Sequence, residues 1–239
     1  MFDKWRKYSY ADQKNQRHRF RWILLWVLGF FVVYTILSSL FFSMRVQENE
    51  TMMPGLQKGD HFIFSSFRFY SFLPGSDISN FLHRGNIVLV DTSLKKKHSV
   101  FYFFFDSVLR FFSAQRLGLE REEEQLYIKR VIGLPGDEVT MTNFVIRVKP
   151  KAELYSFTEF ELWDRPYDAM IPSVPALWDE SLPFSGNMEK ITLGDRECFV
   201  LSDDRSNTND SRTWGPVPVS IIAGKALFRY WPFSRLGLP

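Results

Sequence analysis

Cysteine is almost absent from this 239-residue chain: Cys198 is its one cysteine, which excludes an internal disulfide. Cys198 lies in the apolar run 198–201, where a buried core thiol is expected. The four histidines lie far apart in sequence, and no two have helical metal-ligand spacing, so a zinc site is not expected. The polar segment 202–218 lacks the glycine and the final glutamate of an EF-hand loop. Neither a metal nor another cofactor is therefore expected.

Excess positive charge is also lacking outside the N-terminus. The net charge is +3, but the first 21 residues contain seven Lys/Arg against two aspartates and carry +5. The rest of the chain is therefore net negative, and a nucleic-acid-binding surface on its main body is not supported.

The longest stretch without a charged residue runs from Trp22 to Met44. A helix of this length, at about 1.5 Å per residue, can cross a hydrocarbon core of about 30 Å. A cleaved signal peptide and a buried core helix are the alternatives. The run is longer than a signal-peptide core and no clean Ala-x-Ala site follows, so a transmembrane helix at 22–44 is predicted. The preceding positive charge predicts a cytoplasmic tail, 1–21, and an extracytoplasmic domain, 45–239.

Beyond residue 45, short apolar runs alternate with turn signals, a pattern typical of an all-β body. Strands are predicted at residues 61–64, 87–90, 127–132, 191–194, 197–201 and 223–230.

Two segments do not follow this pattern. Residues 99–112 are rich in phenylalanine at helical spacing, and two interpretations stay open: packing in the domain core, or insertion into the outer leaflet of the membrane. Residues 149–190 are rich in Pro, Trp, Tyr and Phe without clear periodicity, and they are interpreted as a variable β-rich insertion with long loops.

Lys129 lies inside the apolar run 127–132, which leads directly into a Gly-Leu-Pro-Gly-Asp turn. On a strand, Lys129 shares a face with Tyr127 and Val131. Desolvation disfavours the charged amine and lowers its pKa from about 10.4, so that a neutral lysine can act as a general base. The alternative is that Lys129 extends its amine to solvent, as most lysines do.

A hydroxyl residue, Thr51, follows the predicted membrane span, and a hydroxyl needs a base to become a nucleophile. With no histidine in a suitable motif, a desolvated lysine is the chemical alternative. Four segments then resemble those of the bacterial type I signal peptidases, the leader peptidases that use a Ser–Lys dyad. They occur in the family's order and spacing, at residues 51–54, 84–88, 127–137 and 202–218. The resemblance covers most of the chain from Trp22 onward, except 149–190.

This resemblance implies a mainly β fold, in which a single N-terminal transmembrane helix precedes an antiparallel β-rich catalytic domain. It also implies roles for individual residues. Lys129 is similar to the family's general base and Thr51 to its nucleophilic serine. Thr208 matches a serine whose hydroxyl orients the lysine amine. The amide of Asn49 and the backbone N–H of Thr51 would form the oxyanion hole.

The resemblance implies two further groups of site residues. Asp210 and Arg212 match a salt-bridged pair that shapes the site. Positions that line shallow pockets for small substrate side chains are matched by Met52, Leu56, Tyr127 and Ile128.

The chain departs from the family at several positions. The nucleophile is Thr51 instead of serine, Gly55 replaces a threonine, and Ser202 stands where glycine is usual. Glu50 and Ser206 are further departures. The β-branch of threonine restricts χ1 and occupies space beside the attacked carbonyl, and a misplacement of about 1 Å can cost roughly 100-fold in rate.

Two functions are weighed on this basis. The first is a membrane-bound endopeptidase that removes N-terminal signal peptides from exported preproteins through a Thr/Lys dyad. The second is a catalytically impaired paralogue that binds signal peptides without efficient cleavage. Both predict residence in the bacterial cytoplasmic membrane, with preproteins, the lipid bilayer and the secretion translocon as partners.

Overall fold

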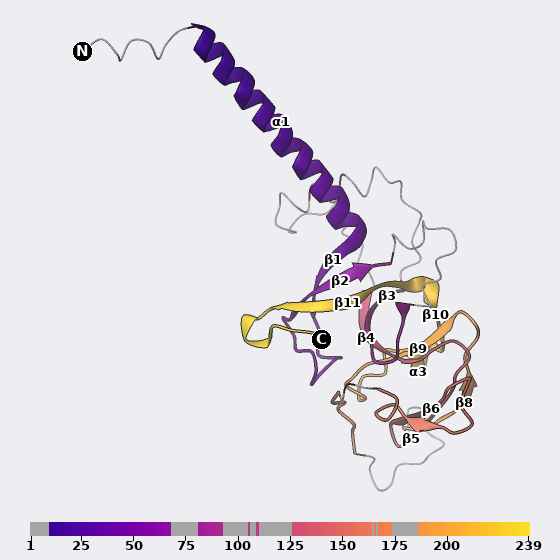
Figure 1. The fold of residues 1–239 in the computed structure, drawn as a ribbon. Helices are drawn as coiled ribbons and strands as arrows, with labels where there is room; N and C mark the ends of the chain where they lie inside the picture. The colour runs from indigo at the N-terminus through magenta and orange to yellow at the C-terminus, as the bar shows by residue number, and fades with distance from the viewer. Residues whose placement is uncertain are drawn as a thin grey trace. The chain divides into compact units, whose positions relative to one another are not determined.

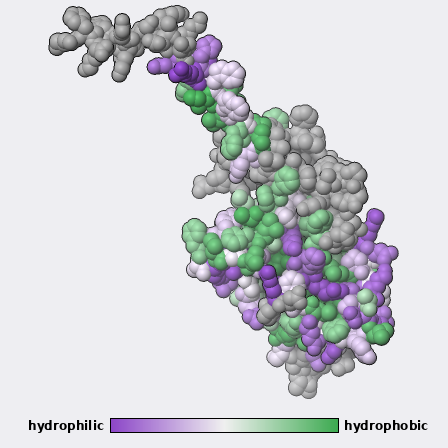
Figure 2. All heavy atoms as spheres, viewed as in Figure 1, coloured by the Kyte–Doolittle hydropathy of each residue, from purple (hydrophilic) through white to green (hydrophobic). Residues whose placement is uncertain are grey.

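The computed structural model describes residues 10–67, 81–92, 105, 109, 126–163, 165, 167–173 and 186–239. Its long N-terminal helix, α1 (Tyr10–Phe41), contains residues 22–41 of the apolar run of the sequence (Figure 1). Large apolar side chains between Phe20 and Tyr34 are mostly exposed, among them Trp26 and Phe30, which are 75% and 74% exposed. In the face drawn in Figure 2, polar residues near the start of the helix give way to apolar ones.

Among the residues described, no helical stretch is long and apolar enough to cross a membrane. The predicted transmembrane helix at 22–44 is thus not confirmed. Its predicted C-terminal boundary is wrong, because α1 ends at Phe41 and residues 42–44 belong to the strand that follows. On that strand, Phe42 and Met44 are half-exposed and pair with Ser65 and Ile63 of the following strand. The helix ends at Phe41 because the next residues take part in this strand pairing.

Most of the strands form an antiparallel seven-stranded sheet in the order β1-β2-β11-β3-β4-β9-β10 (Figure 1). Its strands are β1 (Phe42–Val46), β2 (His61–Ser66), β3 (Ile87–Asp91), β4 (Leu126–Gly133), β9 (Glu197–Leu201), β10 (Val217–Pro218) and β11 (Ile222–Trp231). Alternation of buried and half-buried residues along β2 fits a sheet with one face in the core. A short helix, α3 (Ser211–Trp214), and two 3-10 turns, η4 (Val219–Ile221) and η5 (Phe233–Arg235), complete this part.

A second antiparallel sheet has the order β7-β6-β5-β8. It consists of β5 (Glu138–Thr142), β6 (Val145–Lys149), β7 (Phe157–Thr158) and β8 (Met188–Thr192). Among its described residues, the predicted β-rich insertion at 149–190 contributes the last residue of β6, all of β7 and the start of β8 to this sheet. The other described residues of that segment form turns, loops and two isolated bridges.

Three clusters of buried apolar side chains form the core. One lies around Val88, Val131 and Val200, a second around Met52, Phe62 and Ile128, and a third around Val139, Ile146 and Phe199. Val131 and Ile128 belong to different clusters, in agreement with the predicted alternation of β4. The core residue Cys198 is fully buried, as predicted, and burial raises its pKa to about 12.

The predicted mainly β, antiparallel body is therefore confirmed, and the six predicted strands all begin within three residues of their predicted starts. The phenylalanine-rich segment 99–112 lies outside the described residues, apart from residues 105 and 109.

The turn before β3 is tied to the turn after β4. Arg84 donates to both carboxylate oxygens of Asp137 at 2.8 Å, and Asp137 accepts from the backbone of Leu134. Between Arg84 and β3, Gly85 has φ +77°, and an added Cβ would lie 2.2 Å from the ring of Trp163. This turn therefore requires glycine.

Candidate active site

Lys129 lies on β4, a strand bordered by β3 and β9 in the larger sheet. Its side chain is 0% exposed, so the alternative in which the amine extends to solvent is wrong. The amine nitrogen, Nζ, lies 5.8 Å from the ring centroid of Tyr127 and 5.7 Å from that of Trp214. Desolvation by these surroundings lowers the pKa of Lys129 to about 8, although the nearby Asp210 carboxylate opposes the shift. A substantial fraction of the amine is thus neutral near physiological pH.

The hydrogen-bond partner of this amine is Ser202, whose Oγ lies 2.8 Å from Nζ. Ser202 is fully buried and follows β9 directly. Thr208, the predicted partner, is half-buried in the same loop, and the described residues show no hydrogen bond between it and Lys129. The amine and the loop 202–218 are therefore in contact, but through a different hydroxyl than the one predicted.

Asp210 and Arg212 form the buried ion pair that the sequence predicted, with 2.7 Å between Arg212 Nη2 and Asp210 Oδ2. Asp210 also accepts from the backbone N–H of Ser202 at 3.0 Å. Burial alone would raise the pKa of Asp210, but the hydrogen bond and charge of Arg212 outweigh burial and hold it below its ordinary value. The carboxylate is thus ionised at neutral pH and fixes the start of the loop.

Thr51 lies in a turn after β1 and is half-buried. Its Oγ1 donates to Oδ1 of Asn49 at 2.7 Å, and Gln47, 2% exposed, donates to the same oxygen at 2.9 Å. Asn49 thus faces Thr51 with an acceptor, whereas an oxyanion hole needs a donor. Within the part of the chain that is described, no hydrogen bond joins Thr51 to Lys129.

The backbone nevertheless connects Thr51 to the loop that holds Lys129. The carbonyl of Thr51 accepts from the N–H of Asp204 at 3.0 Å, two residues beyond Ser202. From the insertion, Met170 donates to Asp203 O and accepts from Arg205 N, both at 2.9 Å. The structure therefore brings the candidate nucleophile and the candidate base to the same four-residue stretch of chain, 202–205.

Two buried ion pairs, which the sequence interpretation did not identify, stabilise this stretch. Arg130 contacts both carboxylate oxygens of Asp203 at 2.6 and 2.7 Å. Arg205, 0% exposed, binds the carboxylate of Glu159 in the insertion, and Tyr167 donates to the same carboxylate. Removing one partner of such a buried pair typically costs about 3–5 kcal/mol, because the other charge stays buried. In the sequence, these ion pairs were indicated only by charged residues within or next to apolar strand segments.

The predicted substrate pocket is largely core. Met52, Leu56 and Ile128 belong to one buried cluster and are at most 8% exposed. Tyr127 is half-buried and packs against Trp214, with 5.2 Å between ring centroids. Trp214 was not predicted as a site residue, but its ring packs against Tyr127 and lies next to the amine of Lys129.

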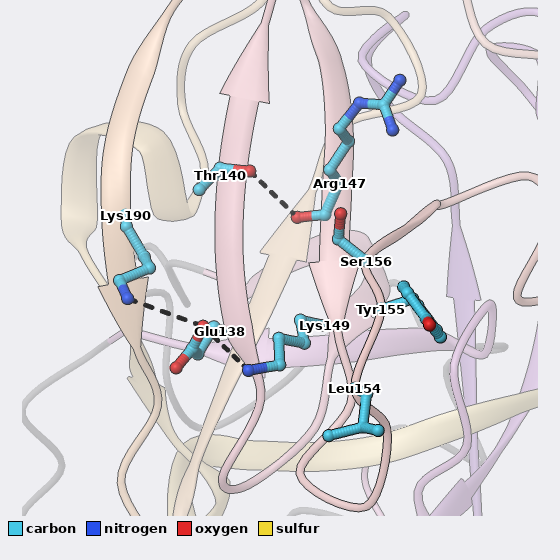
Figure 3. Close-up of a pocket in the computed structure, with 8 residues that line it drawn as sticks. All are labelled: Glu138, Thr140, Arg147, Lys149, Leu154, Tyr155, Ser156 and Lys190. Carbon is cyan, nitrogen blue, oxygen red and sulfur yellow. Dashed lines mark hydrogen bonds and ion pairs between the residues drawn. The ribbon is translucent and has the colours of Figure 1, made fainter.

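A separate pocket lies on the smaller sheet (Figure 3). Glu138 lies 3.8 Å from the amine of Lys149 and 3.6 Å from that of Lys190 there. The lysines are 39% and 60% exposed, so these contacts are solvated and contribute little energy. This pocket shares no residue with the Lys129 site.

Comparison with known proteins agrees with the arrangement of Lys129 and the polar loop. The family model described as "Signal peptidase, peptidase S26" matches residues 19–231. Signal peptidase I of Bacillus caldolyticus is 30% identical over 229 residues, which cover 94% of this chain and 97% of that protein. Signal peptidase IB of Staphylococcus aureus is 32% identical over 109 residues, covering 46% of this chain and 55% of that protein. A match over this much of the chain, joined to a buried lysine and its ion-paired loop, shows that the chain belongs to the signal peptidase family, peptidase S26.

Proposed function

We propose that this protein is an endopeptidase that removes N-terminal signal peptides from exported preproteins, with Thr51 in place of the serine nucleophile. The observation that carries the proposal is the fully buried Lys129 amine with a pKa of about 8. A base is most effective when its pKa lies near the working pH. Family membership supports the substrate class, since the relatives from Bacillus caldolyticus and Staphylococcus aureus are both named signal peptidases.

In the proposed reaction, Oγ1 of Thr51 attacks the carbonyl carbon of the scissile peptide bond, and Nζ of Lys129 takes the hydroxyl proton. The backbone N–H of Thr51, which donates to Oδ1 of Asn49 at 3.4 Å in the free protein, turns to the oxyanion and stabilises it, and Lys129 returns the proton to the leaving amine. Water, deprotonated by Lys129, then attacks the acyl carbon, the bond from that carbon to Oγ1 of Thr51 breaks, and Lys129 returns the proton to Oγ1. For the first step, the Thr51 hydroxyl must turn away from Asn49, with which it is hydrogen-bonded at 2.7 Å.

A second candidate function is signal-peptide binding without efficient cleavage. The hydrogen bond from Thr51 to Asn49 favours it, because the hydroxyl then points to a neutral amide instead of to the base. Against it stand the intact Lys129 and the buried Asp210–Arg212 pair, which a binding protein has no chemical need to keep.

Purified full-length protein in detergent is expected to cleave a preprotein with an Ala-x-Ala site. The logarithm of kcat/KM should rise with pH at unit slope below about 8 and level off above it, because only neutral Lys129 accepts the proton. Cleavage is measured by gel and by mass spectrometry of the new N-terminus. Absence of cleavage at every pH from 6 to 10 would favour the binding function.

We further propose that residues 22–41, the apolar part of α1, anchor the protein in the bacterial cytoplasmic membrane, with residues 45–239 on the outer side. The support is the charge-free run of the sequence, the basic tail before it and the exposed apolar side chains of α1. Protease added to spheroplasts should digest the chain beyond residue 45 and spare the N-terminal tail, as detected with tags at either end. Protection of the C-terminal tag would contradict the orientation.

A further inference from the structure

The fully buried serine at the end of β9 has no role in the family pattern, where a glycine is usual at this position. We infer that Ser202 is the positioning residue of the reaction: its hydroxyl holds the amine of Lys129 so that the nitrogen lone pair faces Thr51. The inference rests on the proposed function and gives Ser202 the part that the resemblance assigned to Thr208.

The sheet register brings the two side chains together. β4 and β9 pair antiparallel with Arg130 opposite Leu201 and Val131 opposite Val200. Continued by one step past the end of β9, this register would set Ser202 opposite Lys129. Residues directly opposite on antiparallel strands have Cβ atoms about 4.5–5.5 Å apart. The 2.8 Å contact from Nζ to Oγ fits this continuation of the strand pairing.

The chemistry of a neutral amine fits this contact. It has two N–H donors and one lone pair, and burial makes an unpaired N–H costly. Ser202 Oγ accepts one N–H, and no other described residue hydrogen-bonds to Nζ. The rings of Tyr127 and Trp214 flank the amine at 5.8 and 5.7 Å. One fixed N–H between two rings limits the directions that the lone pair can take.

The position of Ser202 is itself fixed. Its backbone N–H donates to Asp210, whose carboxylate receives two hydrogen bonds from the side chain of Arg212. Arg212 in turn donates to the carbonyl oxygens of Arg205 and Asn207. The ion pair therefore acts on the amine through the backbone of Ser202.

Thr208 is placed differently. It lies in the middle of the loop, half-buried, and its carbonyl accepts from the N–H of Asp210 and from Oγ1 of Thr213. Of the hydroxyls of Ser202 and Thr208, only that of Ser202 hydrogen-bonds to Lys129 among the residues described.

The test compares Ser202→Ala with wild-type protein at full length in detergent, with a preprotein as substrate. We expect kcat to fall by about 10–100-fold with KM within about twofold, since the base is kept but loses its orientation. The acid limb of the pH profile should move to lower pH, because the lost oxygen favoured the charged amine. The charges of Asp210, Arg212 and Asp203, which also act on Lys129, stay in place.

Two comparisons make the result specific. Ser206→Ala removes an exposed hydroxyl from the same loop, one that donates to Asp204, and should leave both kcat and the acid limb as in wild type. Thr208→Val should have a weaker effect than Ser202→Ala. A large loss and a shifted acid limb in Thr208→Val, with neither in Ser202→Ala, would overturn the inference. If Ser202→Ala does not fold, Ser202→Gly replaces it, since glycine also lacks the hydroxyl.

A readout without turnover separates this inference from the proposed function. Nuclear magnetic resonance of lysine labelled with ¹³C at Cε, assigned with Lys129→Met, reports the titration of Lys129 directly. A lower pKa of Lys129 in Ser202→Ala than in wild type supports the contact even if the wild-type protein cleaves nothing, an outcome that would refute the function alone. An unchanged pKa of Lys129 would overturn the role of Ser202.

Discussion

Lys129→Met is expected to reduce signal-peptide cleavage by about 10²–10⁴-fold, the range that a positioned general base contributes. Methionine has a similar length and no basic nitrogen, so the hydroxyl of Thr51 keeps its place but has no group to take its proton. The measurement is the initial rate of preprotein cleavage at pH 8–9, where the wild-type amine is largely neutral.

Lys151→Met is the matched control. The side chain of Lys151 is 73% exposed and contacts Asp195 at 3.6 Å on the surface, so its replacement should change neither rate nor stability measurably. Cleavage by Lys129→Met at more than about a tenth of the wild-type rate would refute the dyad.

Lys129→Met should preserve or increase the stability of the protein. The pKa of Lys129 is about 8 in the folded protein against 10.5 in the unfolded chain, so burying the charged amine costs about 3 kcal/mol at neutral pH. Removing the amine therefore stabilises the folded protein, but the hydrogen bond from Lys129 to Ser202 is lost as well, which offsets about 1 kcal/mol of that gain. Lys129→Met should therefore be up to about 2 kcal/mol more stable than wild type at pH 7.

The pH dependence of that difference has a definite sign. Between pH 8 and 10.5 the unfolded chain binds more protons at Lys129 than the folded protein does, so wild-type stability rises with pH in this window. The advantage of Lys129→Met should therefore be constant below pH 8 and shrink as pH approaches 10.5. Thermal or urea unfolding of both proteins at pH 7 and pH 10 measures it, and an advantage that grows with pH would contradict the desolvation argument.

The strand that carries Lys129 could be predicted from sequence because its information is local. An apolar run bounded by a Gly-Leu-Pro-Gly-Asp turn predicted residues 127–132, and the structure has Leu126–Gly133. Alternation along that run also placed Tyr127 and Lys129 on one face, where Trp214 meets both.

Partners that depend on the pairing of distant strands could not be predicted in this way. Contact between Lys129 and Ser202 requires the β4–β9 register, which joins residues 73 positions apart. The Arg205–Glu159 pair forms only where the loop after β9 meets the insertion 149–190. The apolar residues of that insertion show no helical or strand periodicity, so the sequence does not indicate where Glu159 lies. The end of α1 was misjudged for a related reason: residues 42–44 are apolar and would continue a helix, but pairing with β2 makes them a strand.

The largest expected loss of activity concerns Thr51. Thr51→Ala should reduce cleavage by at least about 10³-fold, because alanine has no oxygen to form the acyl-enzyme. Thr140→Ala is the matched control, since its hydroxyl makes only a long 3.5 Å hydrogen bond on the smaller sheet. Cleavage that survives Thr51→Ala would refute the assignment of this residue as the nucleophile.

Thr51→Ser, in contrast, should keep or raise activity. In the free protein the Thr51 hydroxyl is hydrogen-bonded to Asn49, and attack requires rotation about χ1 to bring the oxygen to Lys129. A β-branched side chain has fewer accessible χ1 rotamers, and its methyl must fit beside the substrate carbonyl, whereas serine turns more freely. If wild type is inert and Thr51→Ser cleaves, threonine alone has impaired the enzyme. If Thr51→Ser is also inert while Lys129 still titrates near pH 8 and signal peptide still binds, the defect lies in the substrate groove and the protein functions by binding. The ratio of kcat/KM values for Thr51→Ser and wild type on one preprotein therefore decides between the two functions.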